Sequence, residues 1–240
     1  MSVFRNIRVA GVKVLAGAAV AAMIGSAASA QTKWDMPTPY GATKFHTQNI
    51  SQFAAGVAAA TGGKLEITVH PGGSLIKHPE IKNAVRSGQV QIGEFLLSRL
   101  SNENPIYAID SVPFLANNYD AAHKLWEASR ASITALLAEQ GLMPLYAVPW
   151  PPQGIYAKVE LDTIDGLKGI KFRAYNASTE RLAQLVGAVP TQIEVPDIAQ
   201  AFSTGRVDAM ITSPSTGANS KALDFLIHYL DTQAWMPKNV

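Results

Sequence analysis

The 240-residue chain contains no cysteine, which excludes disulfide bonds, a thiol nucleophile, cysteine metal ligands and the lipid anchor of an exported lipoprotein. Charged residues are scarce, at 16% of the sequence. No Gly-x-Ser-x-Gly elbow, His-Glu-x-x-His zinc motif or phosphate-binding glycine loop is present. These absences argue against a hydrolase. We therefore expect no enzymatic activity and no cofactor.

Three potential metal ligands, His70, His78 and Glu80, lie close together in the sequence. Their spacing matches no standard ligand pattern. The histidines flank a Pro-Gly-Gly turn, so we expect both to lie on the surface, and we predict no metal site.

The first thirty residues have the pattern of a secretory signal peptide. Arg5, Arg8 and Lys13 form a basic region, residues 14–24 form a short apolar core, and Ala28-Ser29-Ala30 fits the cleavage rule. An uncleaved anchor is the alternative, but the apolar run is shorter than a membrane span and rich in alanine. We predict a signal peptide over 1–30, a periplasmic mature protein and no membrane insertion after cleavage.

Removal of this segment takes away three cations and no anions, so the formal charge changes from +2 to about −1. The basic character of the whole chain therefore belongs largely to the signal peptide. No basic patch remains that would favour nucleic acid as a partner.

The first half of the mature chain alternates between strand and helix patterns. We predict strands at 33–39 and 65–69, helices at 46–60 and 80–86, and a third strand that begins at Val90 and ends near Phe95 and Leu96. An extended connection at 109–115, a helix at 121–139 capped by Asp120 and a strand at 142–148 follow. This order is typical of a parallel sheet flanked by helices.

The segment Pro149-Trp150-Pro151-Pro152 is too rich in proline for a helix or a central strand, so it predicts a domain crossing. A second α/β pattern follows, with strands at 154–158, 170–173 and 207–211 and helices at 176–186 and 197–202.

Arg173 ends the strand at 170–173, and open α/β sheets place their ligands at such strand ends. A guanidinium there fits a carboxylate through two parallel hydrogen bonds. The alternative is a surface arginine in an ion pair at a sheet edge.

Six blocks in the same order resemble the substrate-binding proteins of TRAP transporters, the DctP family. They are Thr61–Leu65 with Pro71–Leu75, Ser87–Ile92, Pro113–Leu115, Asp165–Arg173, Gly187–Pro190 and Gly205–Ala209. The resemblance implies an α/β periplasmic binding protein fold of the type II-like class, with two lobes that are each a mostly parallel sheet flanked by helices. It implies lobe I at 31–150, lobe II at 151–231 and the start of a return to lobe I at 232–240. Family members continue further, so it also implies that a C-terminal part is missing.

The implied function is capture of an organic carboxylate and its delivery to the membrane subunits of a TRAP transporter. The alternative is a ligand-sensing subunit that signals through a partner.

The resemblance assigns the carboxylate contact to Arg173. Thr212 and Ser213 follow the strand at 207–211, and each is either a ligand contact or, for Ser213 especially, a turn or helix cap. Asn176 is either a helix cap or a ligand contact. Phe95 and Leu96 offer an apolar wall or core packing, and Trp235 faces the cleft or packs at the hinge.

Many relatives carry a second arginine where the chain enters lobe II. Here Trp150 and Gln153 stand in that region, so a flat apolar face and a neutral amide are present in place of a cation. We therefore expect a monocarboxylate with an apolar body in preference to a C4-dicarboxylate. Some relatives use an acidic strand-end residue to hold a cation, and Thr212-Ser213 lacks that carboxylate.

Overall fold

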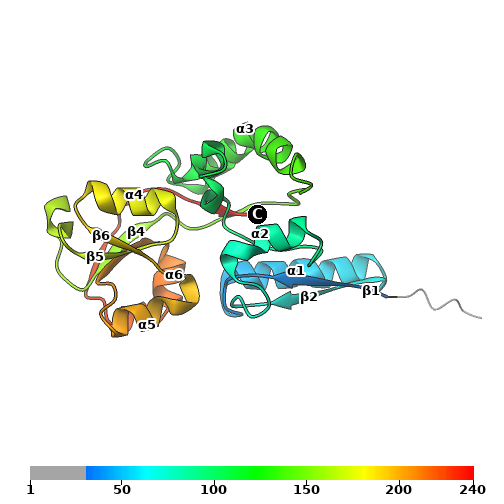
Figure 1. Ribbon diagram of the computed structural model, residues 1–240, viewed down its shortest axis with the longest axis horizontal. Helices are drawn as coiled ribbons and strands as arrows, with labels where there is room; N and C mark the ends of the chain where they lie inside the picture. The colour runs from blue at the N-terminus through cyan, green and yellow to red at the C-terminus, as the bar shows by residue number, and fades with distance from the viewer. Residues whose placement is uncertain (1–30) are drawn as a thin grey trace, which may run out of the picture. The chain divides into compact units, whose positions relative to one another are not determined.

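The structure is a computed structural model that describes residues 31–240. The expected signal peptide lies outside the described residues. Residues Gln31–Val240 form one compact unit in which strands and helices alternate (Figure 1). The predicted α/β fold class is confirmed. Among these residues, no helix combines the length and the apolar character needed to cross a bilayer.

The N-terminal elements follow the predicted pattern closely. Strands β1 (Thr32–Pro37) and β2 (Leu65–His70) pair in parallel, with Thr32 opposite Leu65. Helix α1 (Phe45–Ala60) connects them, and α2 (His78–Arg86) follows β2. Met36, Ile50, Ala54, Ile67 and Ile92 form the buried cluster between α1 and the two strands. This packing explains why the apolar positions of α1 recur at helical spacing.

The third strand predicted from Val90 onward does not form, and this prediction is wrong. The Asp35 N–H donates to the side chain of Gln91 (3.1 Å), so a side-chain contact replaces the backbone ladder bond a third strand would need. Of the described residues from Val90 to Phe95, only Glu94 donates from its backbone N–H to the main chain of β1, at Pro37 O (3.1 Å). The segment then turns away, and Phe95 exchanges two backbone hydrogen bonds of 3.1 Å with Val240.

Two short 3-10 helices, η1 (Leu97–Leu100) and η2 (Pro105–Ser111), follow, so the extended connection expected at 109–115 begins inside η2. Helix α3 (Tyr119–Ala138) matches the prediction, but its N-cap is Asn118, whose side chain accepts from Ala121 N (2.9 Å). Asp120 lies in the first turn, where its charge favours the helix dipole. The strand predicted at 142–148 is reduced to β3 (Val148–Pro149), since its only ladder partner among residues 31–240 is the short β9 (Lys238–Asn239).

A five-stranded sheet forms the second half, in the order β6-β5-β7-β4-β8. Its strands are β4 (Gly154–Ala157), β5 (Lys171–Ala174), β6 (Val189–Gln192), β7 (Ala209–Thr212) and β8 (His228–Leu230). Strand β5 runs parallel to β6 and β7, whereas β4 runs antiparallel to β7 and β8. The sheet is therefore mixed, which corrects the expectation of a mostly parallel one.

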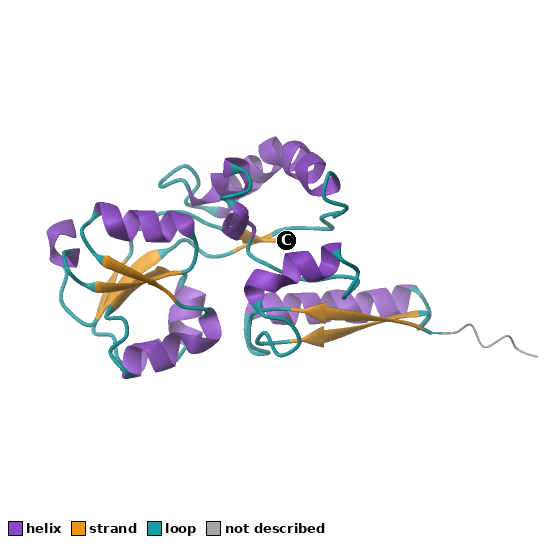
Figure 2. Ribbon diagram, in the orientation of Figure 1, coloured by secondary structure: helices purple, strands orange, loops and turns teal. Residues whose placement is uncertain are grey.

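Helices flank this sheet (Figure 2). They are α4 (Ala177–Leu185), α5 (Ile198–Ser203) and α6 (Pro214–Asn219), with 3-10 turns η3 (Ile164–Leu167), η4 (Val195–Asp197) and η5 (Ala222–Asp224). Sequence patterns predicted α4, α5, β4, β5 and β7 but missed the short β6, β8 and α6.

The proline-rich segment lies beside the C-terminal segment. Trp150 N donates to Pro237 O (2.8 Å), and Gln153 N donates to Trp235 O (3.0 Å). Proline has no N–H, so only the two non-proline residues between 149 and 153 donate here. The proline-rich segment therefore runs alongside residues 235–237, joined to them by backbone hydrogen bonds.

Candidate ligand-binding site

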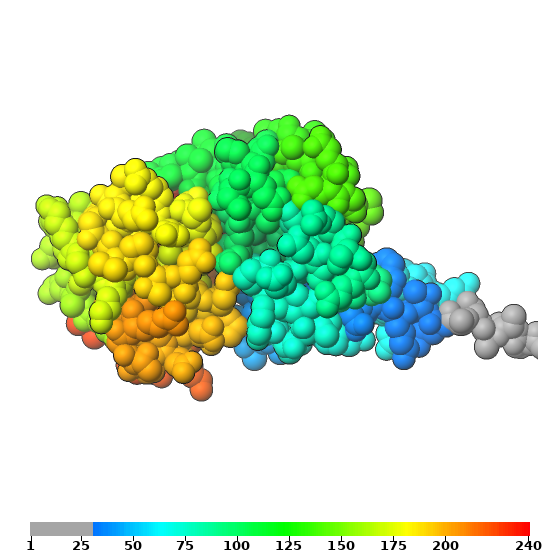
Figure 3. Space-filling view, viewed as in Figure 1, coloured from blue at the N-terminus to red at the C-terminus, as the bar shows by residue number. Residues whose placement is uncertain are grey.

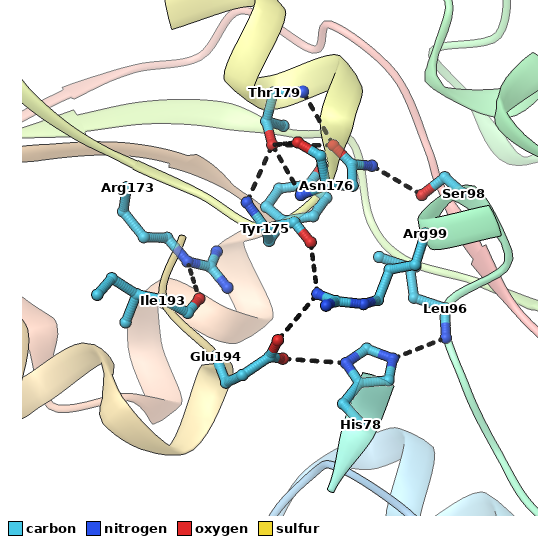
Figure 4. Close-up of polar contacts among 10 residues, drawn as sticks. All are labelled: His78, Leu96, Ser98, Arg99, Arg173, Tyr175, Asn176, Thr179, Ile193 and Glu194. Atoms are coloured by element: carbon cyan, nitrogen blue, oxygen red, sulfur yellow. Dashed lines mark hydrogen bonds and ion pairs between the residues drawn. The ribbon is translucent and has the colours of Figure 1, made fainter. Parts of the chain in front are cut away.

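Arg173 lies near the carboxyl end of β5, as predicted, beside the parallel strand β7. The residue is 2% exposed, and its Nε donates to Ile193 O (2.9 Å). Its guanidinium carbon lies 5.0 Å from the centre of the Tyr175 ring. Within residues 31–240 its two terminal nitrogens make no hydrogen bond. Figure 4 shows them pointing toward the space bounded by Tyr175, Arg99 and Glu194.

The environment of Arg173 makes its charge costly when no anion is present. Burial lowers the pKa of Arg173 to about 10, and the charge of Arg99 adds to this, while Tyr175 and Glu194 oppose it. The group is still a cation at neutral pH. A carboxylate that met the two free nitrogens would replace the lost hydration with charge-assisted hydrogen bonds.

Arg173 lines a pocket in which the space outside protein atoms is about 370 Å³, open solvent at the mouth included, and the centre of a water molecule can occupy about 30 Å³ of it. Residues from both halves of the chain form its wall. They are Tyr40, His78, Leu96, Arg99, Trp150, Gln153, Arg173, Tyr175, Glu194, Val195, Thr212, Ser213, Thr216 and Pro237. Six of these fourteen residues are aromatic or aliphatic, and the other eight are polar or charged. Convergent polar groups beside apolar walls are what orient a small ligand in its site.

Glu194 connects the two halves at this pocket. Its Oε1 lies 2.9 Å from Nη1 of Arg99, and its Oε2 lies 3.1 Å from Nδ1 of His78. Arg99 also donates to Tyr175 O (2.7 Å). In the space-filling view the surface of α4 (yellow) adjoins that of residues 97–111 (green) (Figure 3). These contacts join segments that are far apart in the sequence.

The hydrogen bonds of His78 fix its protonation state. The Leu96 N–H, which can only donate, points to Nε2 at 3.1 Å, so that nitrogen is an acceptor and the ring proton sits on Nδ1. Burial lowers the pKa of His78, in agreement with a neutral ring. Burial acts to raise the pKa of Glu194, but the hydrogen bond from His78 and the charge of Arg99 outweigh it and leave that pKa lowered.

This placement corrects the surface position expected for His78, which is 8% exposed. The expectation failed because His78 is the first residue of α2, and this end of the helix forms part of the pocket wall. His70 does lie at the surface, where Nε2 is 2.7 Å from Asp35 Oδ1. Among residues 31–240, no three His, Asp or Glu side chains are grouped so that they could hold a metal ion.

Five of the sequence-predicted site residues lie in the pocket wall: Arg173, Thr212, Ser213, Gln153 and Trp150. Strands β5 and β7 are parallel neighbours, so their carboxyl ends bring Arg173 and Thr212 to one edge. The Thr212 hydroxyl makes no hydrogen bond within the described part of the chain. Ser213 also caps α6, accepting from Thr216 N (3.2 Å), so the helix-cap alternative is confirmed, whereas a ligand contact of Ser213 stays a prediction.

The other three predicted residues lie outside the pocket wall. Asn176 caps α4, accepting from Thr179 N (2.9 Å), and donates to Ser98 Oγ (2.8 Å), so both ends of its amide are used. Phe95 belongs to a core cluster with Ile81 and Leu97. Leu96 lines the pocket instead, because successive side chains of an extended segment point to opposite sides. Trp235 is 2% exposed and donates from Nε1 to Tyr175 Oη (3.0 Å).

Sequence reasoning missed several polar residues of the site, among them Arg99, Tyr175 and Glu194. Tyr175 had a usable signal, because it is two residues after Arg173 and side chains at that spacing share one side of an extended chain. Arg99 and Glu194 follow segments whose local structure was not predicted correctly. Arg99, from another part of the chain, brings a second cation to the pocket wall, where it is paired with Glu194.

The fold, with two halves meeting at a small polar pocket around a strand-end arginine, is that of a solute-binding protein. The chain belongs to the family of bacterial extracellular solute-binding proteins, family 7, whose model matches residues 39–238.

Two solved structures are close relatives. The extracytoplasmic solute receptors DctP6 and DctP7 of Bordetella pertussis, both described as binding pyroglutamic acid, are 47% and 49% identical to this chain. Each superposes with a TM-score of 0.85, over 87% of this chain and 69% of the receptor. A curated solute-binding protein of Albidiferax ferrireducens is 27% identical over 211 residues, which is 84% of this chain and 62% of that protein. The chain therefore spans less than two thirds of that curated relative.

Proposed function

We propose that the protein is a periplasmic receptor that binds a small organic monocarboxylate and delivers it to the membrane subunits of a TRAP-type transporter. In this proposal lobe I comprises residues 31–150, lobe II residues 151–231, and residues 232–240 return to lobe I. The observation that carries it is the Arg173 guanidinium, which is buried and presents two unbonded nitrogens to a pocket between the halves.

The charges of the pocket favour an acid with one negative charge. Arg173 and Arg99 bring two positive charges, Glu194 brings one negative charge and His78 is neutral. One positive charge is left in excess, and it belongs to Arg173, since Arg99 is already paired with Glu194. A second carboxylate on the ligand would meet Glu194, and like charges that share a small site repel each other.

The walls favour a compact ligand with an apolar body. Tyr40 and Trp150 pack edge to face with ring centres 5.0 Å apart, and Leu96 and Val195 add aliphatic surface. Pyroglutamate, the ligand of the two Bordetella receptors, is a five-membered ring with one carboxylate and fits this chemistry. We therefore propose pyroglutamate or a similar cyclic or short monocarboxylate as the ligand.

The proposal is tested by titrating the purified full chain with L-pyroglutamate in a calorimeter. We expect saturable binding, and a rise in thermal midpoint that grows with ligand concentration, because a ligand that binds only the folded state stabilises it. Replacing Arg173 by Ala should weaken binding by more than about tenfold, since a charge-assisted bidentate contact is lost. Replacing Arg206, an exposed arginine, by Ala should change nothing. Unchanged binding by Arg173→Ala would contradict the site.

The transporter partner is tested separately. Ligand-loaded protein should be retained by membranes that contain TRAP subunits and not by membranes without them. Retention by a signalling receptor in place of the transporter would favour a sensing role.

A further inference from the structure

Trp235, Tyr175 and Gln153 form a chain of hydrogen bonds that ends at the pocket. Trp235 Nε1 lies 3.0 Å from Tyr175 Oη, and Tyr175 Oη lies 3.2 Å from Gln153 Oε1. All three residues are buried, with exposed fractions of 2%, 7% and 2%. Tyr175 and Gln153 line the pocket, whereas Trp235 stands behind them.

The direction of each hydrogen bond in this chain is fixed by chemistry. An indole N–H can only donate, so Tyr175 Oη accepts from Trp235. Burial raises the pKa of Tyr175, so the phenol keeps its hydrogen at every ordinary pH. The Tyr175 hydroxyl therefore donates this hydrogen to the amide oxygen of Gln153, Oε1.

The other end of the amide is fixed independently. Gln153 Nε2 donates to Pro151 O, a group that can only accept, at 3.4 Å. This contact is long and uses one of the two N–H groups. The second N–H has no partner within residues 31–240, and the side chain lines the same pocket as the Arg173 guanidinium.

We propose that Trp235 is a positioning residue that acts through Tyr175 to hold the Gln153 amide with an N–H donor toward the ligand. This inference rests on the proposed function and narrows its ligand class. The favoured acid carries a neutral hydrogen-bond acceptor, such as a lactam, amide or keto oxygen, besides its carboxylate. An acid without that acceptor leaves a buried N–H unsatisfied, and such groups discriminate strongly between otherwise similar ligands.

Two probes of one ring size separate the carboxylate contact from the amide contact. L-Pyroglutamate has the ring carbonyl, and cyclopentanecarboxylate has the same ring with neither carbonyl nor ring nitrogen. The full chain should bind pyroglutamate more tightly by at least about tenfold in calorimetric titrations. The Gln153→Leu variant, which keeps the side-chain volume, should lose most of that preference.

The decisive variant is Trp235→Phe, which removes the indole N–H and keeps an aromatic ring. We expect the preference for pyroglutamate to fall by roughly three- to tenfold, with little change in the affinity for cyclopentanecarboxylate. Tyr175→Phe keeps the ring beside Arg173 and should reproduce this result, which covers the case in which Trp235→Phe fails to fold. Trp34→Phe is the matched control, because the Trp34 indole makes no hydrogen bond among residues 31–240.

A double-mutant cycle completes the test. In the Gln153→Leu background, Trp235→Phe should have no further effect on the preference. Equal weakening of both acids by Trp235→Phe, or full additivity with Gln153→Leu, would overturn the positioning role and leave the proposed function standing. Failure of the unmodified chain to bind either acid would overturn both.

Discussion

Glu194 Oε2 lies 3.1 Å from Nδ1 of His78, a residue 116 positions earlier in the chain, and Glu194 Oε1 lies 2.9 Å from Nη1 of Arg99 (Figure 4). One carboxylate thus holds two groups of the other half of the chain while it forms part of the pocket wall. Glu194 therefore joins the two halves of the chain at the pocket and also neutralises the charge of Arg99, one of the two arginines in the pocket wall.

The Glu194→Gln variant should change which acids the protein prefers. A glutamine amide has one oxygen, so it can accept from Nδ1 of His78 or from Arg99 but not from both. Arg99 is no longer neutralised, so the pocket gains a second unpaired positive charge. We expect the affinity for succinate relative to pyroglutamate to rise by about tenfold, since an opposite charge nearby stabilises a second carboxylate. Competition calorimetry with the two acids measures this ratio.

Glu160→Gln provides the control for the loss of a carboxylate, because Glu160 is exposed and makes no ion pair among residues 31–240. An unchanged ratio in Glu194→Gln would mean that Arg99 does not reach a second carboxylate.

The neutral state of His78 makes the folded protein sensitive to mild acid. Burial lowers the pKa of His78 in the folded state, so the unfolded chain binds a proton more readily. The stability from this histidine is complete above its ordinary pKa of about 6.5 and is lost as the pH falls from there toward the lowered value. Protonation would also break the hydrogen bond from Leu96 N to Nε2.

We therefore expect the thermal midpoint to fall less between about pH 7 and pH 5 in His78→Gln than in the unmodified chain. The stability that comes from the lowered pKa of Glu194 is present throughout this range and is lost only as the pH falls below the ordinary carboxyl pKa of about 4.3. His123→Gln, at an exposed position of α3, should keep the original pH profile. Identical profiles for His78→Gln and the unmodified chain would contradict the assignment.

Local sequence patterns predicted the helices and strands in which apolar residues recur at regular helix or strand spacing. Helix α1 and strand β2 each bury one face against the same cluster, so their periodicity reflects the packing. Arg173 was predicted because a strand end is a local feature that recurs across α/β sheets. Short elements such as β6 and β8 carry too few residues for a period to show.

The contacts that complete the site depend on residues far apart in the sequence. The Glu194–Arg99 ion pair and the Asn176–Ser98 hydrogen bond each join segments that no local pattern relates. Trp235 was expected either to face the cleft or to pack at the hinge, and its indole donates to Tyr175 behind the pocket wall. Side-chain direction at such a crossing is decided by tertiary packing, which overrides local preference.

Arg173 should cost stability in the absence of ligand. Its charge is buried, and its only hydrogen bond within residues 31–240 is the one to Ile193 O. Methionine has a similar length and no charge to desolvate, so Arg173→Met should raise the thermal midpoint of the ligand-free protein while abolishing binding. Differential scanning calorimetry without ligand measures the midpoint, and Arg206→Met serves as the exposed control. A lower midpoint would show that Arg173 has a structural role of its own.

The buried pair of Asp110 and Lys238 fastens the C-terminal segment to the rest of the fold. Each side chain is 2% exposed, their charged atoms lie 3.0 Å apart, and Asp110 also accepts from Lys238 N at 3.0 Å. Burial raises the pKa of Asp110, and the charge and hydrogen bonds of Lys238 offset that rise only in part.

Asp110→Asn removes one charge and leaves the Lys238 ammonium buried without a counter-ion. Such a change costs about 3 to 5 kcal/mol, because desolvation of the remaining charge is no longer offset. Denaturant unfolding should show this loss, and the exposed Asp162→Asn should show none. The double variant Asp110→Asn, Lys238→Met should recover most of the stability, since it removes the uncompensated charge as well. A double variant as unstable as the single one would mean that Asp110 acts through its bond to the main chain of Lys238 and not through the ion pair.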